Sequence, residues 1–468
     1  MAPINKLPND IFTLLPDFLD KRAKKKMAVT LTHVCQAWRE IFVTCVPLWT
    51  DFDCKDAHKT RVYFERSKGY PINLWLEKKK GLSPNDPFLE IAPHIFSRLK
   101  NLSVETTPNC LQDITKHLTQ PAPLLESLTI NEDTTIEHGP IPVLTTELFG
   151  GDLTSLRELR LQSVRTSLPW RGMNNLTKFT LGFIERPTLC VGDLLDFFEG
   201  APRLSEINFH TSSPASDSQD GRLVSLEHLR RLTIYGPEPP SIMLNHLVIP
   251  VGASVLTHFD SPNPHIGGLF PESLDNLRNL PNFTHIRLHF DQFSLTLRFA
   301  GPNGRFLVSF PTRPDSTHLI VRAMPRFDTS HTHRLDLIDD GPMTNEILQL
   351  VRSLKNLRTL RVSQIDNMFD FFLAINSVLN EESDVPCQKL EEFICRARKQ
   401  PHTGVMAMFA KGRASRGVPL KSIKVVSFGD PAYREDIEEL REHVPHVELS
   451  FGRYRSRYYR DESSDEDG

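Results

Sequence analysis

The sequence predicts an α/β chain in which a small N-terminal helical unit precedes a long array of repeated short strands. Three observations carry this prediction: helical spacing of apolar residues near the N-terminus, recurring leucine-rich segments, and one alternating pattern around a Gly/Pro turn. The chain has 468 residues. That length exceeds one ordinary compact core, but a repeat array can form a single long domain at this size.

Residues 4–52 form the predicted helical unit. Leu7-Pro8 opens it, because proline is well tolerated in the first turn of a helix. Apolar residues then recur three or four positions apart and predict one apolar stripe: Ile11, Phe12, Leu15 and Leu19. Pro16 interrupts this stripe, so the helix is expected to kink or end near Leu15.

A second apolar stripe predicts a further helix, which Pro47 ends. Its members share one helical face: Leu31, Val34, Trp38, Ile41 and Cys45. The basic run at residues 21–26 lies before this stripe. A solvated connection between helices is favoured there over a nuclear-localisation patch, because charge runs are usually solvated.

Residues 53–95 are predicted to connect this helical unit to the repeats. A short helix is expected over residues 60–68. Ile72, Leu74 and Leu76 alternate with other residues, which predicts a strand.

The chain changes character from about residue 96. Three segments share the pattern L-x-x-L-R-x-L-x-[LIV], at residues 153–161, 226–234 and 354–362. Looser copies of L-x-x-L-x-L begin at Leu99, Leu125, Leu176, Leu204, Phe283, Leu390, Leu420 and Val444. Successive cores from residue 99 to 229 are about 20–31 residues apart, near the period of leucine-rich repeats. Residues 96–450 are therefore predicted to form an irregular leucine-rich-repeat solenoid.

The physics of the repeat predicts a parallel α/β horseshoe. The two apolar residues of L-x-L point inward from a short strand, and the residue between them points to solvent. Stacked repeats bury a continuous core that no single repeat could bury. Helix-like runs at residues 191–198 and 345–354 supply the outer layer. Solvent-facing positions such as Arg160, Thr233 and Arg361 are candidates for binding, although the substrate cannot be deduced from them.

Two stretches depart from the repeat pattern. Alternating apolar residues flank Gly301-Pro302-Asn303-Gly304, which predicts a β-hairpin inserted into the solenoid. Residues 451–468 mix arginine and tyrosine with acidic residues and are predicted to be a disordered tail. Ser463 and Ser464 precede acidic residues there and are candidate sites for an acidophilic kinase.

Composition and missing motifs exclude several classes of function. The formal net charge is −3, which argues against an electrostatic nucleic-acid binder, and no apolar window is long enough to span a membrane. No secretory signal precedes the seven scattered cysteines, so a reducing intracellular location, cytoplasmic or nuclear, is expected.

Cys387 and Cys395 are expected to be buried. His331 and His333 lack further ligands for a metal, and no catalytic motif occurs. The sequence therefore predicts a binding protein without a cofactor, not an enzyme.

The N-terminal segment resembles the F-box-like domains of fungal, mushroom-type proteins. The resemblance rests on Leu7-Pro8, Ile11 and Phe12, LTHVCQAWREI at residues 31–41, Pro47-Leu48-Trp49, and the following residues 60–76. It covers about 75 of the 468 residues. The resemblance implies binding to a Skp-family adaptor and, through it, a cullin scaffold. The adaptor contacts that it implies are Leu7, Pro8, Ile11, Phe12, Leu15, Val34, Trp38, Leu48 and Trp49.

The resemblance thus implies the substrate-recognition subunit of an SCF-type cullin-RING ubiquitin ligase, whose repeats bind a protein substrate. A ligase-independent binding protein with a degenerate F-box is the alternative. It is motivated by Pro16, where the family usually has an apolar residue, and by the basic run. Within the helical unit, ordinary burial is favoured for Ile41, Phe42 and Cys45.

Overall fold

The structure is a computed structural model that describes residues 11, 14–18, 21–78, 81–132, 143–144, 148–166, 172–182, 190–210, 221–261, 266–290, 293–311, 316–339, 345–363, 387–397, 403–427 and 434–451. The chain is α/β and divides into two compact units. The first unit comprises Met1–Glu238 with Ile242–Pro250, and the second comprises Pro239–Ser241 with Val251–Gly468.

The first unit contains a ladder of parallel strands in which each strand pairs with the next in the list. In order, these are β1 Asp51–Asp53, β2 Ile72–Lys78, β3 Leu99–Thr106, β4 Ser127–Glu132, β6 Glu158–Gln162, β8 Lys178–Gly182, β9 Glu206–His210 and β11 Arg231–Gly236. Two short parallel pairs accompany them: β5 Val143–Leu144 with β7 Arg165–Thr166, and β10 Val224–Ser225 with β12 Leu247–Val248.

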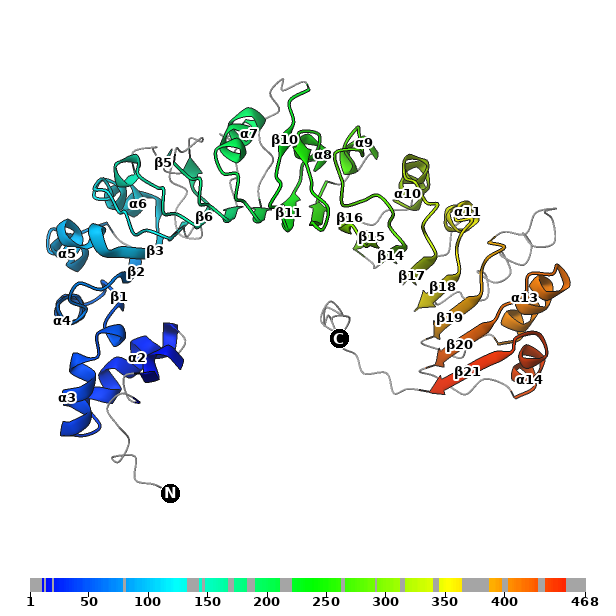
Figure 1. Ribbon diagram of the computed structural model, residues 1–468, viewed down its shortest axis with the longest axis horizontal. Helices are drawn as coiled ribbons and strands as arrows, with labels where there is room; N and C mark the ends of the chain where they lie inside the picture. The colour runs from blue at the N-terminus through cyan, green and yellow to red at the C-terminus, as the bar shows by residue number, and fades with distance from the viewer. Residues whose placement is uncertain are drawn as a thin grey trace. The chain divides into compact units, whose positions relative to one another are not determined.

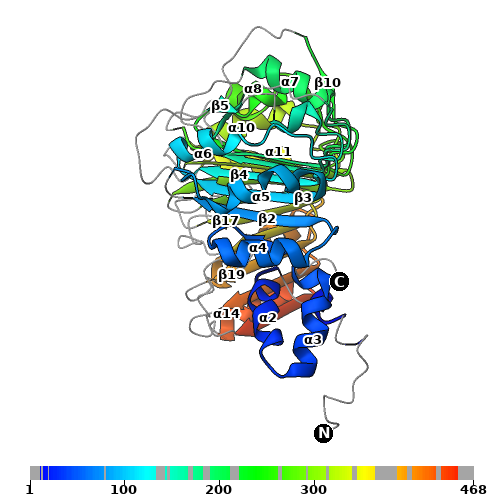
Figure 2. The ribbon, with the colours of Figure 1, turned by 90° about the vertical axis from the view of Figure 1, so that its left-hand side faces the viewer.

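Helical segments alternate with these strands. Before residue 250 they are η2 Leu15–Phe18, α2 Lys21–Thr32, α3 Gln36–Thr44, η3 Val46–Leu48, α4 Ala57–Arg66, α5 Pro87–Ile95, η4 Phe96–Arg98, α6 Pro108–Thr115, η5 Leu148–Gly151, α7 Val191–Glu199 and α8 Ser241–Leu244. Helices α4, α5 and α6 lie along one face of the ladder (Figure 1), and Figure 2 looks onto that face with α4 and α5 in front of β2 and β3. The opposite side of each ladder, on which none of the described helices lies, is here called the open face.

The second unit contains a mixed ladder. Its strands, in the order in which they lie in the sheet, are β13 Ser254–Phe259, β16 Gly304–Pro311, β15 Ser294–Gly301, β14 His285–Phe290, β17 Arg334–Asp339, β18 Thr359–Ser363, β19 Glu392–Ala397, β20 Ser422–Ser427 and β21 His446–Phe451. The helical segments are α9 Ile266–Leu269, α10 Ser316–Ala323, η6 Met324–Arg326, α11 Asn345–Ser353, α13 Thr403–Ser415 and α14 Arg434–His443. Helices α10, α11 and α13 lie on one side of the strands (Figure 1).

The predicted β-hairpin is present. Strands β15 and β16 pair antiparallel from Ser294↔Pro311 to Gly301↔Gly304. The hairpin lies between β13, which pairs in parallel with β16, and β14, which pairs antiparallel with β15. Its turn requires glycine, because a Cβ on Gly304 would lie 2.4 Å from the carbonyl oxygen of Ala253 and φ there is +131°.

The leucine-rich segments predicted the strands closely. In each of the three best copies the strand includes the last L-x-[LIV]: Leu159 and Leu161 in β6, Leu232 and Ile234 in β11, Leu360 and Val362 in β18. These six side chains are at most 9% exposed. The predicted outer helices at residues 191–198 and 345–354 are α7 and α11. Apolar alternation therefore places the core on the helix-covered face.

Strands β13 and β17 do not show the complete L-x-x-L-x-L pattern, because threonine occupies one of its buried positions in each copy. In β13, Thr257 takes an inward position, is fully buried, and donates a hydrogen bond to the carbonyl oxygen of Leu307 at 3.3 Å. Before β17, fully buried Thr332 stands where the first leucine of L-x-x-L-x-L would be, followed by Leu335 and Leu337. A hydroxyl thus interrupts the apolar pattern without preventing burial: that of Thr257 has a backbone partner, whereas that of Thr332 has no hydrogen-bond partner among the described residues.

The N-terminal part required corrections. The single helix predicted from Leu31 to Cys45 is two helices, because α2 ends at Thr32 and α3 begins at Gln36. The basic run at residues 21–26 is the start of α2 and not a connection between helices. The segment predicted to connect the two parts, residues 53–95, already belongs to the sheet, since β2 pairs with both β1 and β3.

Candidate functional site

Two parts of the chain are candidate sites: the N-terminal helices, where the sequence predicted adaptor contacts, and a cluster of charged residues on the open face of the second unit. The structure divides the predicted adaptor contacts into interior and surface residues. Leu48 is fully buried and Trp49 is 1% exposed. Both side chains therefore lie in the interior of the folded chain and not on the surface where the predicted adaptor contacts would be.

Trp49 is held inside by three specific contacts. Its Nε1 donates to the carbonyl oxygen of Phe42 at 2.9 Å, its ring meets Tyr63 edge-on at 4.9 Å, and the guanidinium of Arg66 lies 4.4 Å from its ring centre. Phe42 and Cys45 are also buried, as predicted. Trp49 thus links α3 to α4, the helix that packs against β1.

Other predicted contacts remain at the surface. Val34, between α2 and α3, is 55% exposed, and Ile11 is 45% exposed. Trp38 on α3 and Leu15 in η2 are half-buried. Leu7, Pro8 and Phe12 lie outside the described residues.

Exposed apolar side chains are unusually frequent in this region. Eleven large hydrophobic residues of the described chain are exposed, and five of them precede residue 35: Ile11, Leu14, Phe18, Val29 and Val34. Phe18 is 83% exposed. Isolated apolar residues on a surface need no explanation, whereas a concentration in one short segment is typical of a protein-binding surface.

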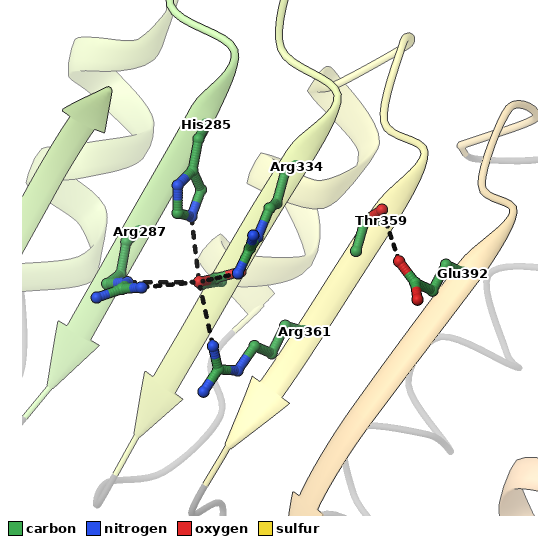
Figure 3. Close-up of polar contacts among 7 residues, drawn as sticks. His285, Arg287, Arg334, Thr359, Arg361 and Glu392 are labelled. Carbon is green, nitrogen blue, oxygen red and sulfur yellow. Dashed lines mark hydrogen bonds and ion pairs between the residues drawn. The ribbon is translucent and has the colours of Figure 1, made fainter. Parts of the chain in front are cut away.

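The second candidate site centres on Asp336, in the middle of β17. Figure 3 shows the side chains of its partners His285, Arg287, Arg334 and Arg361 converging on one point. Its side chain is 0% exposed although it lies on the open face. Arg334 Nε lies 3.0 Å from Oδ1 and its Nη2 3.2 Å from Oδ2, while Arg287 Nη2 lies 3.3 Å from Oδ2. His285 Nε2 and Arg361 Nη1 lie 3.1 and 3.9 Å from the same Oδ2.

Strand register explains this convergence. Asp336 pairs with Arg287 on β14 and with Arg361 on β18, so all three side chains share one row across the open face. His285 and Arg334 form the adjacent row. The leucines on either side of Asp336 point into the core, as do Leu288 and Phe290 of β14, which lie near Ile320 and Ile347.

The charges around Asp336 keep its carboxyl group ionised. Burial by itself raises the pKa of a carboxyl group, but here the pairing with His285 and Arg334 outweighs burial. The pKa of Asp336 therefore lies well below its ordinary value. The carboxylate remains negative at any physiological pH.

Basic residues outnumber acidic ones in this part of the open face. Arg298 on β15 stands directly opposite Arg287 in the antiparallel pair, and like charges in that position repel. Beyond β18, Glu392 is close enough to accept a hydrogen bond from Thr359, at 3.1 Å (Figure 3). The cluster formed by His285, Arg287, Arg298, Arg334, Asp336 and Arg361 is here called the arginine cluster.

The open face of the first unit is different in character. Its first row runs through Asp51, Asn73 and Asn101, with Asn73 Nδ2 donating to Asp51 Oδ1 at 2.6 Å. The next row contains Ser103, Thr129, Arg160 and Thr180. These are mainly neutral polar side chains, so the concentration of arginine belongs to the second unit.

Sequence reasoning anticipated this site only in part. Of the three positions expected to face solvent, Arg160 is exposed, but Thr233 and Arg361 are buried at 7% and 9% exposure. Arg361 does lie on the open face, where its neighbours cover it. No local motif marks Asp336, because its partners come from three strands separated by loops of different length. The only indication of this site in the sequence is an ionisable residue, Asp336, between two leucines, Leu335 and Leu337.

The two cysteines singled out in the sequence have structural roles. Cys387 and Cys395 are buried, as predicted, and burial raises the pKa of each thiol to about 12. Within the described residues no group of three or more histidine, cysteine, aspartate or glutamate side chains is placed to bind a metal. In the same residues, no helix combines the length and apolarity needed to cross a membrane.

Comparison with known proteins does not assign this chain to a family. No family model matches the sequence, and no curated protein is significantly similar to it.

Proposed function

We propose that this chain is the substrate-recognition subunit of an SCF-type ubiquitin ligase, in which the N-terminal helices bind a Skp-family adaptor and the sheet-containing body binds a protein substrate. The observation that carries the proposal is the concentration of exposed apolar side chains before residue 35. A helical surface of this kind suits a partner that buries apolar side chains between helices. The adaptor would in turn connect the chain to a cullin scaffold.

The strand arrangement of the sheet-containing body supports this proposal, because it is the arrangement expected of a leucine-rich-repeat solenoid. In the first unit, parallel strands follow one another in chain order, and each is separated from the next by a helix or a loop. The L-x-x-L-x-L segments coincide with these strands, and their leucines are buried. Stacked repeats with one strand each offer an extended face for binding another protein.

In the proposed receptor, the buried residue Trp49 would hold the N-terminal helices in a fixed position relative to the body. A ligase receptor acts by proximity, so the adaptor-binding helices have to be fixed relative to the body that binds substrate. Trp49 contacts Phe42 in α3 and Tyr63 in α4, and β1 follows it directly. The proposed adaptor surface is consequently Ile11, Leu15, Val34 and Trp38, without Leu48 and Trp49.

Co-expression with a fungal Skp-family adaptor tests the proposal. The informative variant is Val34→Asp, and Val251→Asp is its matched control, because both valines lie outside helices and strands and are 55% and 61% exposed. The proposal predicts co-purification of wild type and Val251→Asp, with at least a tenfold loss of affinity for Val34→Asp. Folded wild-type protein that does not bind the adaptor contradicts the proposal.

A ligase-independent binding protein is the second candidate. Pro16 lies in the 3₁₀ segment η2, Leu15–Phe18, and the described part of α2 begins at Lys21. A broken first helix would weaken the adaptor surface. The same co-expression experiment separates the two functions, since this candidate predicts no complex with either the wild type or the control.

A further inference from the structure

Strand β21 is the last strand of the ladder in the second unit (Figure 1). Among the described strands it pairs only with β20, in parallel from Ser422↔His446 to Ser427↔Phe451. The ladder of the first unit begins differently, because helices α2 and α4 contact β1 and all three residues of β1 are buried. A strand at the edge of a sheet presents a row of backbone N–H and C=O groups that can pair with another chain. The outer edge of β21 is therefore a candidate binding surface.

The strand register identifies which residues of β21 direct their backbone groups outward. The N–H of Ser422 donates to the carbonyl oxygen of Glu391, so Ser422 directs its backbone groups toward β19 and away from β21. Alternate residues of a strand direct these groups to opposite sides, so Ile423 faces β21, and its register partner Val447 faces away from β20. The same two-residue spacing gives the full set of outward-facing residues: Val447, Leu449 and Phe451.

The core-facing side chains of β21 are less buried than those of the neighbouring strand. Val447 and Leu449 are half-buried, whereas Ile423 and Val425, aligned with them on β20, are each 1% exposed. The terminal repeat of a solenoid lacks a next repeat to cover its core, which is why terminal repeats need a cap. A partner that adds a strand at this edge would cover both side chains.

We propose that two copies of this chain associate through β21, with the two strands antiparallel about a two-fold axis at Leu449. Leu449 then stands opposite its counterpart in the second copy, Val447 opposite Phe451, and Glu448 opposite Ser450. Opposed outward-facing residues exchange two backbone hydrogen bonds per pair, about six in total. The proposal goes beyond the ligase function and does not depend on it.

Pairing and charge both favour this register and make β21 self-complementary. A shift to either neighbouring register that still opposes outward-facing residues leaves fewer such pairs. One of those two registers also sets Glu448 opposite its own counterpart, and like charges directly opposite destabilise a strand pair. In the proposed register Glu448 faces the neutral Ser450 and keeps its ion pair with Lys424, at 2.8 Å. A second copy of the same strand therefore fits the edge without a repulsive pair at Glu448.

Sedimentation equilibrium of the full chain, without adaptor, tests the proposal. Wild type is expected to form a dimer that dissociates on dilution from about 100 to 1 µM, because an interface of one strand from each copy is small. Leu449→Lys is expected to weaken self-association about tenfold, since it sets two like charges opposite each other at the axis. Val251→Lys is the matched control, because Val251 is 61% exposed and lies outside the strands, and it should leave the dimer unchanged. Thermal unfolding verifies that each variant is folded.

Cysteine cross-linking tests the register separately. Leu449→Cys places the two thiols opposite each other, with about 5.5 Å between the Cα atoms, a separation that a disulfide can bridge. Val447→Cys is matched to it, because both side chains are half-buried on the same face of β21, but the two copies of residue 447 are offset by about 13 Å along the strands. In a Cys35→Ser background, which removes an exposed thiol, oxidation should give a covalent dimer only for Leu449→Cys on non-reducing electrophoresis.

Wild type that stays monomeric across this concentration range overturns the proposal and leaves the edge to a different extended segment. Equal cross-linking of the two cysteine variants, or a dimer that is unchanged in Leu449→Lys, overturns the antiparallel pairing through β21. Because no adaptor is present, these outcomes are distinct from failure of the ligase proposal, which co-expression with the adaptor tests.

Discussion

Arg334 and Asp336, two residues apart on the same strand, form a bidentate ion pair whose two shortest contacts are 3.0 and 3.2 Å. Both side chains point to the open face of the sheet, because residues i and i+2 of a strand share a face. The carboxylate is fully buried only because basic residues from the neighbouring strands surround it.

Asp336→Asn is expected to destabilise the chain by about 3 kcal/mol at pH 7, since it leaves several positive charges without their common anion. The pKa of Asp336 is lower in the folded chain than its ordinary value of 3.8. Its contribution is therefore complete above about pH 4 and is lost as the pH falls from there toward the folded-state pKa. Urea unfolding of wild type and variant should show a gap that is constant at neutral pH and narrows below about pH 4. A gap that widens with acid would contradict this assignment.

Gly304→Ala should destabilise the hairpin by about 2 kcal/mol, because the new Cβ meets the backbone of Ala253 at 2.4 Å and alanine disfavours φ of +131°. Gly69→Ala is the control, since a Cβ there meets nothing within 4 Å. Thermal unfolding measures both. Equal stability of the two variants would show that the turn is not constrained as described.

Trp49→Ala is expected to reduce mainly folding stability, whereas Trp38→Ala is expected to reduce mainly adaptor binding. Loss of buried Trp49 should cost about 3–5 kcal/mol of folding stability. Trp38 is half-buried and meets Phe42 edge-on at 5.5 Å, so its loss should cost about 1 kcal/mol while weakening adaptor binding at least tenfold. Urea unfolding and adaptor titration separate the two effects. A severe loss of stability in Trp38→Ala would place that residue in the core instead.

Cysteine labelling reports on the same surface. Cys35 lies beside Val34 and is exposed, whereas Cys54 and Cys395 are buried, which raises the pKa of each thiol to about 12. Iodoacetamide at pH 8 should therefore modify Cys35 first, because the thiolate is the reactive form. Mass spectrometry of the adaptor complex should show protection of Cys35, with half-buried Cys190 as the internal reference. Unchanged labelling of Cys35 in a stable complex would place the adaptor elsewhere.

Local patterns in the sequence predicted most of the strands. A buried strand needs apolar residues at alternate positions, and L-x-L supplies them at Leu159 and Leu161 or at Leu360 and Val362. The hairpin was equally clear, because Gly304 occupies a turn that other residues would strain. The pattern failed where threonine replaced an apolar residue, at Thr257 and Thr332, because a polar side chain at a core position breaks the apolar alternation on which the prediction depends.

Burial of the large aromatic residues near the N-terminus required the tertiary structure. Trp38 and Trp49 occupy similar contexts in the sequence, and both were predicted to face an adaptor. Trp49 is interior because Tyr63 and Arg66, from the following helix, enclose it. Such contacts between helices depend on packing angles that apolar spacing does not specify.

The sequence by itself determined the α/β class, the strand positions marked by L-x-L and the inserted hairpin, because these depend on residues close together in the chain. Only the tertiary structure decided which side chains meet across strands. Arg287, Asp336 and Arg361 lie far apart in the sequence but share one row of the sheet. Register is set by the whole ladder, so the arginine cluster exists only once the strands are aligned.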